Sequence, residues 1–155
     1  MLTVLFVGAD AGQVALAEAL FQKWVVPAIE NKRALQGAWA HPCTVHSGCA
    51  VTNMNGVPGF ANEHALACMR GLGLPVYENT IQAISTLNIN DYGLIVCMNL
   101  EAAIIVLANK PSWLMMVANA AQGGIPVPTE QSVAAYEQCA KVLGKVIAEV
   151  IHIIV

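Results

Sequence analysis

Apolar residues along this chain fall into short blocks of two kinds, separated by Gly, Asn, Pro and charged residues. Four blocks have the length and the apolar or β-branched character of buried strands, and they cover residues 2–7, 43–49, 92–98 and 112–117. Between them, apolar residues recur every three or four positions, which is typical of amphipathic helices. Strands that alternate with helices predict a doubly wound α/β sheet of four parallel strands.

The helical blocks have predictable ends. The first helix follows residues 8–12 and carries apolar residues at helical spacing, namely Val14, Leu16, Ala17, Leu20, Phe21 and Trp24. Pro27 is expected to end or kink this helix at Val26, because proline lacks the backbone N–H that a helix interior needs. The other helices are expected over residues 28–35, 62–72 and 100–107 and from Thr129 onward. Gly73 is expected to stop the helix that precedes it.

The last helix has a clear start and a clear buried face. Thr129 is suited to cap it, because a threonine hydroxyl can accept a hydrogen bond from the first helical turn. Its buried face is expected to comprise Val133, Tyr136, Ala140, Leu143, Ile147 and Val150. We interpret the three tryptophans, Trp24, Trp39 and Trp113, as packing residues, and expect Trp39 to be the one exposed at an interface.

Charged residues are scarce. Of 155 residues, 57% are hydrophobic and 11% are charged, against roughly 25% charged residues in a typical soluble domain. The length predicts a single domain over residues 1–155. The shortage of surface charge predicts that a partner covers some apolar surface, most simply a second copy of the chain in a homo-oligomer. A net charge of −3 with seven Lys and Arg residues argues against nucleic acid as a partner.

The sequence carries no signal for a membrane, for secretion or for a metal. No apolar run reaches the roughly 18 residues of a membrane span, and the N-terminus lacks the basic region of a signal peptide. We therefore expect a cytoplasmic protein that does not bind membranes. The five cysteines lack C-x-x-C spacing and the four histidines lack H-x-x-x-H spacing, which favours buried thiols and predicts no metal and no cofactor.

The chain is organised around residues 2–18, LTVLFVGADAGQVALAE. They read as a buried strand, a tight loop from Gly8 to Gly12, and the start of a long helix. In an open α/β sheet, ligands bind just beyond the carboxyl end of such a strand. The free N–H groups of the loop and of the first helical turn favour an anion there. The sequence therefore predicts the architecture of an anion site.

Four signatures follow one another along the chain. They are VLFVG with ALAEALFQK over residues 4–8 and 15–23, VHSGC over 45–49, GVPGFANEHALACMRGLGLP over 56–75, and DYGLIVCMN over 91–99. In this order they resemble the low-molecular-weight protein tyrosine phosphatase family, which includes thioredoxin-type arsenate reductases. The likeness covers nearly the whole chain. It implies a three-layer α/β sandwich of the phosphotyrosine protein phosphatase I type, with a four-stranded parallel sheet and helices on both faces.

The chain departs from this family at the residues that carry its chemistry. The resemblance implies a nucleophilic Cys at the end of the first strand, an Arg that holds the phosphoryl oxygens, and an Asp that protonates the leaving group. Gly8 stands at the nucleophile position. Gln13 or Val14, depending on the register, stands at the Arg position, and Asn119 is the best match to the acid. The resemblance thus implies a phosphatase-like fold without phosphatase activity.

The loop offers its own anion. The segment Asp10-Ala11-Gly12-Gln13 fits a capping box, in which an N-cap acid is followed three residues later by Gln. Our hypothesis is that the Asp10 carboxylate accepts the amides that a phosphate would occupy in the active relatives. It would also repel a dianion, since two unit charges 4 Å apart cost about 4 kcal/mol at an effective dielectric near 20. In the alternative, Asp10 points to solvent and the loop merely connects strand to helix.

Three functions follow from these residues. The first is a catalytically inactive, phosphatase-like domain that acts through protein contacts, as a homodimer or with another protein. The second is a small-molecule-binding protein or enzyme that uses a remodelled loop, with Asp10, Gln13 and Asn119 as its polar groups. The third is an active phosphatase or arsenate reductase that uses an unrecognised thiol, for which Cys97 at the carboxyl end of the third strand is the candidate.

We expect no catalytic residues and one remnant phosphate-loop pocket. Its residues are expected to be Gly8, Ala9, Asp10, Ala11, Gly12, Gln13, Asn99 and Asn119.

Overall fold

A computed structural model describes residues 2–35, 45–52, 63–74, 81–108, 114–116 and 132–148. Within these residues the strands form one parallel sheet with the order β3-β2-β1-β4-β5. The strands are β1 Leu2–Gly8, β2 Val45–Val51, β3 Gln82–Ala83, β4 Leu94–Cys97 and β5 Leu114–Met116. The four predicted strands are β1, β2, β4 and β5, and the predicted fold class is confirmed. The two-residue β3 adds a fifth strand at the edge of the sheet.

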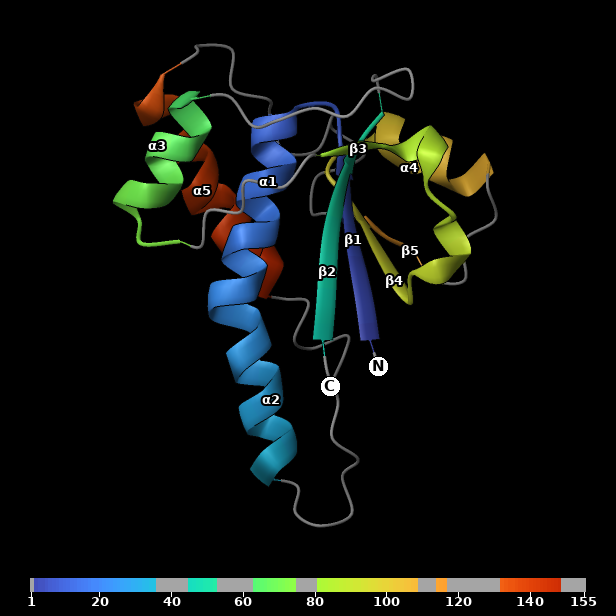
Figure 1. Ribbon diagram of the computed structural model, residues 1–155, viewed down its shortest axis with the longest axis horizontal. Coiled ribbons are helices and arrows are strands. Elements are labelled where there is room, and N and C mark those ends of the chain that lie inside the picture. The colour runs from blue at the N-terminus through green and yellow to red at the C-terminus, as the bar shows by residue number, and fades with distance from the viewer. Residues whose placement is uncertain are drawn as a thin grey trace.

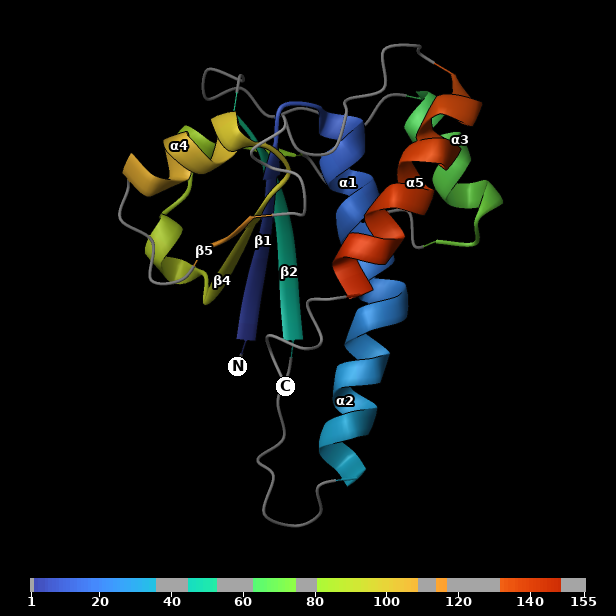
Figure 2. The same ribbon diagram turned by 180° about the vertical axis from the view of Figure 1, so that it is seen from behind.

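Helices lie on both faces of this sheet. They are α1 Ala11–Leu20, the π-helical turn η1 Phe21–Val25, α2 Val26–Leu35, α3 Glu63–Gly71, α4 Leu100–Ala108 and α5 Val133–Ala148, with 3-10 turns η2 Ile84–Thr86 and η3 Ile89–Asp91. Helices α1, α3 and α5 cover one face, and α4 lies on the other (Figures 1 and 2). None of the described helices is both long enough and apolar enough to cross a bilayer.

Strand β1 is central and is buried on both sides. Val4 and Phe6 belong to the core cluster under α1 and α5, whereas Leu5 and Val7 belong to the cluster on the α4 side. Because successive side chains of a strand point to opposite faces, a continuous apolar run supplies both clusters at once. The ring of Phe6 meets that of Phe21 edge to face, with 5.3 Å between the ring centroids.

The first helix does not stop at its proline. Residues 11–35 form one continuous helical rod (Figure 1). Of the two predicted outcomes, an end or a kink at Val26, the end is therefore wrong, and the proline is instead preceded by a local distortion. The π-helical turn η1 lies directly before Pro27, and the Val26 N–H donates to the Phe21 carbonyl, five residues back. A proline ring crowds the carbonyl four residues earlier, here that of Lys23. The wider π turn lets the helix pass the proline.

Trp24 is exposed rather than packed. Its relative exposure is 62%, and the Lys23 Nζ atom lies 5.2 Å from its ring centroid. A π turn contains more residues than an α turn, so residues after Phe21 rotate off the apolar face that the α-helical spacing predicts. Trp39 and Trp113 lie outside the described residues.

Gly73 ends α3 as predicted. It has a φ of +67°, the left-handed conformation that glycine adopts without strain. The Leu74 N–H donates to the Met69 carbonyl at 2.9 Å, which closes the end of the helix. The Lys23 Nζ donates to the Gly73 carbonyl at 2.7 Å and so fixes the end of α3 against η1.

The start of the last helix differs from the prediction. Helix α5 begins at Val133, and the Ser132 hydroxyl accepts a hydrogen bond from the Ala135 N–H at 3.2 Å. Ser132 is therefore the cap in place of Thr129, which lies outside the described residues. On the predicted buried face, Tyr136, Ala140, Leu143 and Ile147 are buried and Val133 is half-buried. Val150 also lies outside the described residues.

Candidate functional site

The loop after β1 lies at the carboxyl edge of the sheet, between the ends of β2 and β4. The Thr52 N–H donates to the Gly8 carbonyl at 3.0 Å, and the Met98 N–H donates to the Val7 carbonyl at 2.9 Å. The structure thus brings Asn99, which follows β4, to the same edge of the sheet as the loop. Asn119 lies outside the described residues.

The end of β1 is filled by apolar side chains. A Cβ atom at Gly8 would lie 2.9 Å from Val14 Cγ1 and 3.1 Å from Met98 Cγ. Both side chains are fully buried, and the β-branched Val14 has little rotamer freedom in a helix. We call Gly8, Val14 and Met98 the apolar plug. A side chain at Gly8 could be accommodated only if the plug moved.

Val14 is significant because of its place in the sequence. Counted strictly from Gly8, it stands where the resemblance implies the phosphate-binding Arg, whereas the other register places Gln13 there. Its Cγ1 methyl group packs over the strand end. The position therefore contributes packing and no charge.

Asp10 caps α1, as the capping box predicts. Its backbone is extended, with φ −107° and ψ 125°, and its Oδ2 atom accepts a hydrogen bond from the Gln13 N–H at 2.9 Å. The same oxygen accepts a second hydrogen bond from the Tyr136 hydroxyl at 3.0 Å. The carboxylate is thus turned onto the helix N-terminus and onto α5 rather than away from them.

The Tyr136 contact depends on Gly12. A Cβ atom at Gly12 would lie 2.7 Å from both Cε1 and the hydroxyl oxygen of Tyr136, and 2.9 Å from Ala65 Cβ. The missing side chain lets α5 and α3 approach the first turn of α1. Sequence reasoning assigned Tyr136 to the buried face of α5 and missed its role at the loop. The available signal was a phenol on an otherwise apolar face, since a buried tyrosine usually finds a hydrogen-bond partner.

The Gln13 side chain is fully buried and turns toward α5. Its Nε2 atom donates to Cys139 Sγ at 3.8 Å, so the amide group contacts α5. Burial raises the pKa of the Cys139 thiol, the Gln13 amide opposes this rise, and the charge of Asp10 adds to it. Burial therefore favours the protonated form of the Cys139 thiol.

Asn99 caps the second helix that starts at this edge. Its Oδ1 atom accepts a hydrogen bond from the Ala102 N–H at 2.8 Å, in the first turn of α4. An amide that a side chain already caps is not free to bind an anion. Both α1 and α4 therefore begin with an amide occupied by a side chain of this protein.

None of the described cysteines has the environment of an activated thiol. Burial raises the pKa of Cys97 to about 12 and that of Cys68 to about 11, with Glu137 adding to the second shift. Burial, together with the nearby Glu18 carboxylate, also raises the pKa of Cys49. A reactive thiol needs a lowered pKa, and burial shifts the pKa of Cys97 in the opposite direction.

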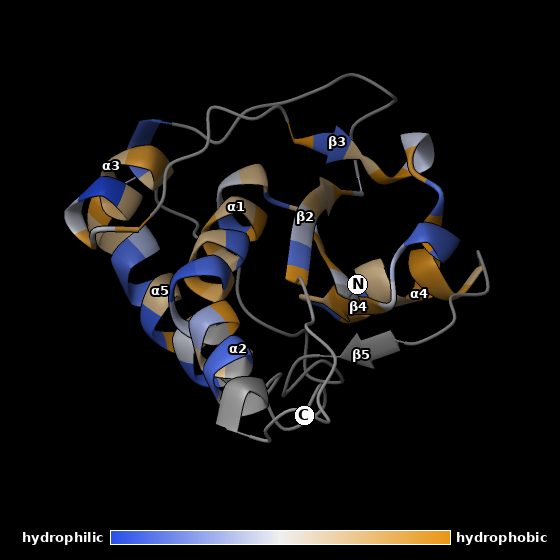
Figure 3. Ribbon diagram, turned by 60° about the horizontal axis from the view of Figure 1, so that its bottom comes forward, coloured by the Kyte–Doolittle hydropathy of each residue, from blue (hydrophilic) through white to orange (hydrophobic). Residues whose placement is uncertain are grey.

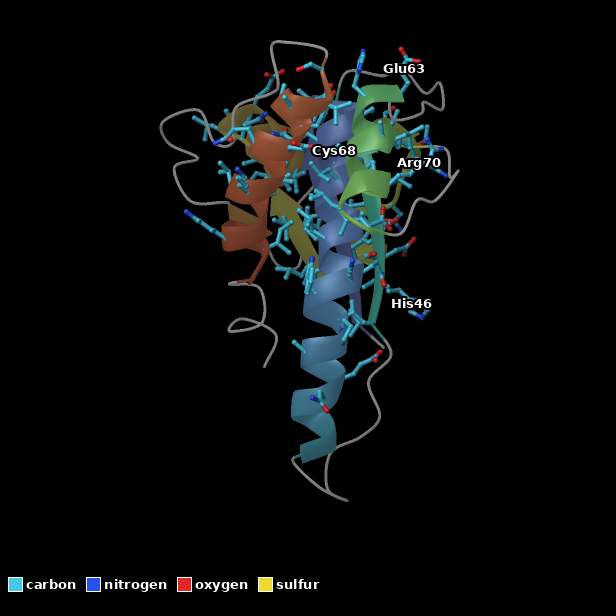
Figure 4. All side chains as sticks on the ribbon, turned by 90° about the vertical axis from the view of Figure 1, so that its left-hand side faces the viewer. His46, Glu63, Cys68 and Arg70 are labelled. Carbon is cyan, nitrogen blue, oxygen red and sulfur yellow. The ribbon has the colours of Figure 1, made fainter. Side chains whose placement is uncertain are left out.

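Within the described ranges, Glu63, Arg70, Cys68 and His46 do not converge on the loop. Cys68 lies on the buried side of α3, whereas Glu63 and Arg70 point outward from the same helix (Figure 4). His46, on β2, is exposed near the end opposite the loop (Figure 4). Across the described ranges, no group of three or more His, Cys, Asp or Glu side chains could hold a metal ion.

A separate polar contact joins α1 to β2. The Ser47 hydroxyl donates to Glu18 Oε1 at 3.1 Å, and Gln22 Nε2 donates to the Ser47 hydroxyl. These partly buried groups satisfy one another between a helix and a strand, so the structure gives Ser47 a positioning role in the fold.

No family model matches the sequence, and no curated protein matches it. Solved structures do match the fold. A mutant of YwlE from Bacillus subtilis has a TM-score of 0.75 at 14% identity, covering 99% of each chain. A low-molecular-weight protein tyrosine phosphatase from T. tengcongensis has a TM-score of 0.70 at 14% identity, covering 98% of this chain and 99% of the other. An arsenate reductase in the phosphate-binding state has a TM-score of 0.67 at 13% identity, covering both chains fully.

These likenesses define the class of fold. The chain has the α/β fold of low-molecular-weight tyrosine phosphatases and arsenate reductases. At 13–14% identity the likeness speaks for the fold alone, because one fold hosts many functions.

Proposed function

We propose that this protein is a divergent, non-catalytic member of the low-molecular-weight phosphatase family that acts through protein contacts. The observation that carries the proposal is the apolar plug at the end of β1. The nucleophile of the family would project from this point, and Val14 Cγ1 lies 2.9 Å from where its Cβ atom would be. The strand end therefore offers neither an attacking group nor space for one.

The electrostatics of the loop support the same proposal. A phosphate is bound at such a loop by backbone amides and by cations. Here the Gln13 amide is bound to the Asp10 carboxylate, and the family's Arg position is Val14 or Gln13. A second anion about 4 Å from Asp10 would be repelled by about 4 kcal/mol per pair of charges at an effective dielectric near 20.

The small-molecule alternative finds less support. It relies on Asp10 and Gln13 as polar groups that face a ligand. In the structure, Asp10 Oδ2 accepts from the Tyr136 hydroxyl, and the Gln13 amide is buried against Cys139. Both groups contact α5, so a ligand would have to replace these contacts. We therefore prefer the first function.

We place this function in the cytoplasm. The described cysteines, Cys49, Cys68, Cys97 and Cys139, form no disulfide. Free thiols of this number are typical of a reducing compartment. Recovery of the tagged protein from a membrane or secreted fraction would contradict this placement.

Activity assays test the proposal directly. The protein is incubated with p-nitrophenyl phosphate, and separately with arsenate and a thioredoxin system, with an active low-molecular-weight phosphatase as the positive control. We expect rates equal to those of buffer. Metal-independent turnover that follows the protein through purification would overturn the proposal.

Anion titrations test whether the charge of Asp10, rather than the shape of the loop, excludes anions. Phosphate and tungstate are titrated into the wild type and into Asp10→Asn, which keeps a capping side chain but removes its charge. We expect no binding to the wild type below 1 mM, on the order set by the repulsion above, and measurably tighter binding to Asp10→Asn. Equal binding by both proteins would show that the Asp10 carboxylate does not exclude anions.

A further inference from the structure

Helix α4 buries small apolar side chains and exposes large ones, which is the reverse of the usual arrangement on a surface helix. The side chains that face the sheet are small, namely Ala102, Ala103 and Val106, and all three are fully buried. The large side chains of Leu100, Ile104 and Leu107 are instead exposed, at 44%, 60% and 54%. Half of the large hydrophobic side chains that are exposed within the described ranges lie on this one helix.

These three residues form one stripe. Positions i, i+4 and i+7 fall on the same side of an α-helix, and we call Leu100, Ile104 and Leu107 the α4 stripe. By contrast, α5 directs Glu137, Lys141 and Lys145 to solvent. Figure 3 shows hydrophilic positions along α5, whereas α4 is coloured mainly toward the hydrophobic end. A helix that is apolar all round is typical of one that is covered on both sides.

We propose that the α4 stripe is a homodimer contact, in which a second copy of this chain packs its own α4 antiparallel across a two-fold axis. The spacing fits this occupant. Ile104 lies about 6 Å along the helix from Leu100 and about 4.5 Å from Leu107, so the stripe is nearly symmetric about its most exposed residue. An antiparallel copy places Ile104 against the partner's Ile104 and Leu100 against the partner's Leu107, as a two-fold contact requires.

The charges also fit a second copy. The sequence of α4, LEAAIIVLA, contains one charged residue, Glu101. In the antiparallel pair, Glu101 and the partner's Glu101 lie on opposite sides of the axis, about 9 Å apart along the helices, so like charges do not meet. The stripe offers no donor or acceptor, so a polar partner surface would lose its hydration without compensation. An apolar helix is the matching surface, and this chain supplies one.

The size of the stripe sets the strength of the contact. Three half-exposed side chains cover much less than the roughly 800 Å² that each partner contributes to a standard interface. We therefore expect a reversible dimer with a Kd on the order of 10–500 μM. This inference deepens the proposed function by naming a partner and a surface, and it makes no use of the loop after β1. A monomeric protein that lacks phosphatase activity would overturn the dimer alone.

Sedimentation velocity of the full chain from 5 to 500 μM tests the contact. We expect the weight-average mass of the wild type to rise toward that of a dimer, and Ile104→Glu to weaken the association at least tenfold. Val142→Glu is the matched control, because Val142 is a similarly exposed apolar residue, at 41%, on α5. Circular dichroism confirms that both variants are folded.

Cross-linking tests the symmetry. A residue on a two-fold axis meets its own copy, so under mild oxidation Ile104→Cys is expected to form a disulfide dimer. Leu100→Cys alone is not expected to form a disulfide dimer, whereas the double variant with Leu100→Cys and Leu107→Cys is expected to form one. A wild type that stays monomeric at 500 μM, equal weakening by Val142→Glu, or a dimer of Leu100→Cys alone would each overturn the proposal.

Discussion

On one face of the sheet, α1 and α5 close over the end of β1, whereas on the other face α4 leaves its large side chains in solvent. The first face uses close packing at Gly8 and Gly12 and buries its polar groups against one another. The second face packs small residues inward and carries large ones outward. The same low-charge sequence thus packs closely over the end of β1 on one face and exposes the α4 stripe on the other. Apolar residues therefore serve two different ends in this fold, close packing at the end of β1 and an exposed stripe on α4.

A substitution at Gly12 tests how tightly α1 packs against α3 and α5, and it is expected to cause the greatest loss of stability. Gly12→Ala places a Cβ atom within 3 Å of Tyr136 and Ala65, and we expect it to lower the free energy of unfolding by about 3 kcal/mol. Gly144→Ala is the control, because a Cβ atom there meets nothing within 4 Å. In the α5 helix it is expected to stabilise by about 0.5–1 kcal/mol. Urea denaturation measures both, and equal effects would contradict the close packing.

A smaller effect tests the apolar plug. Gly8→Cys restores the family's thiol but forces it against Val14, and we expect a loss of about 2 kcal/mol in stability with no phosphatase activity. Val14→Ala removes the crowding methyl groups. The double variant is therefore expected to lose less unfolding free energy than the two single variants lose together. Simple additivity would show that Val14 does not close the strand end.

The contact between α5 and the loop is tested by Tyr136→Phe. This variant keeps the buried ring and removes only the hydroxyl that donates to Asp10. A lost hydrogen bond to a carboxylate is expected to cost about 1.5 kcal/mol. Thermal or urea unfolding measures the loss, and a change below about 0.3 kcal/mol would show that this bond contributes little.

The smallest effect comes from the α4 side, where Cys97 lies in the core cluster. Burial raises its pKa from 9.0 to about 12 in the folded protein. The folded state therefore holds this proton more tightly, so stability is full below pH 9 and falls as the pH rises toward 12. Cys97→Ala is expected to reduce the loss between pH 8 and pH 10 by about 1 kcal/mol. An unchanged pH profile would contradict the shift.

Local patterns in the sequence predicted local structure. The apolar or β-branched runs located β1, β2, β4 and β5. The signal is most continuous for β1 and β4, because Val4–Val7 and Leu94–Cys97 are buried on both faces of the sheet. Asp10 was identified as a cap because its partner, Gln13, is three residues away. Strand β3 was missed because two residues carry too little pattern.

Longer-range features were not visible in the sequence. Tyr136 lies 126 residues from Asp10, and no spacing rule connects them. The resemblance placed Gly8 at the position of the family's nucleophile. However, only the structure shows that Val14 and Met98 fill the space. The π turn before Pro27 likewise depends on relief of a backbone clash, which apolar periodicity does not encode.

The attachment of the Asp10 carboxylate to the helix that it caps has a kinetic and thermodynamic consequence. A free anion that approaches the first turn of α1 competes with the Asp10 carboxylate, which belongs to the same chain. The effective concentration of a tethered group is in the millimolar range even for a short flexible linker, and this one is held three residues from its amide. A free anion of equal intrinsic affinity for the Gln13 amide must therefore exceed that effective concentration to displace Asp10.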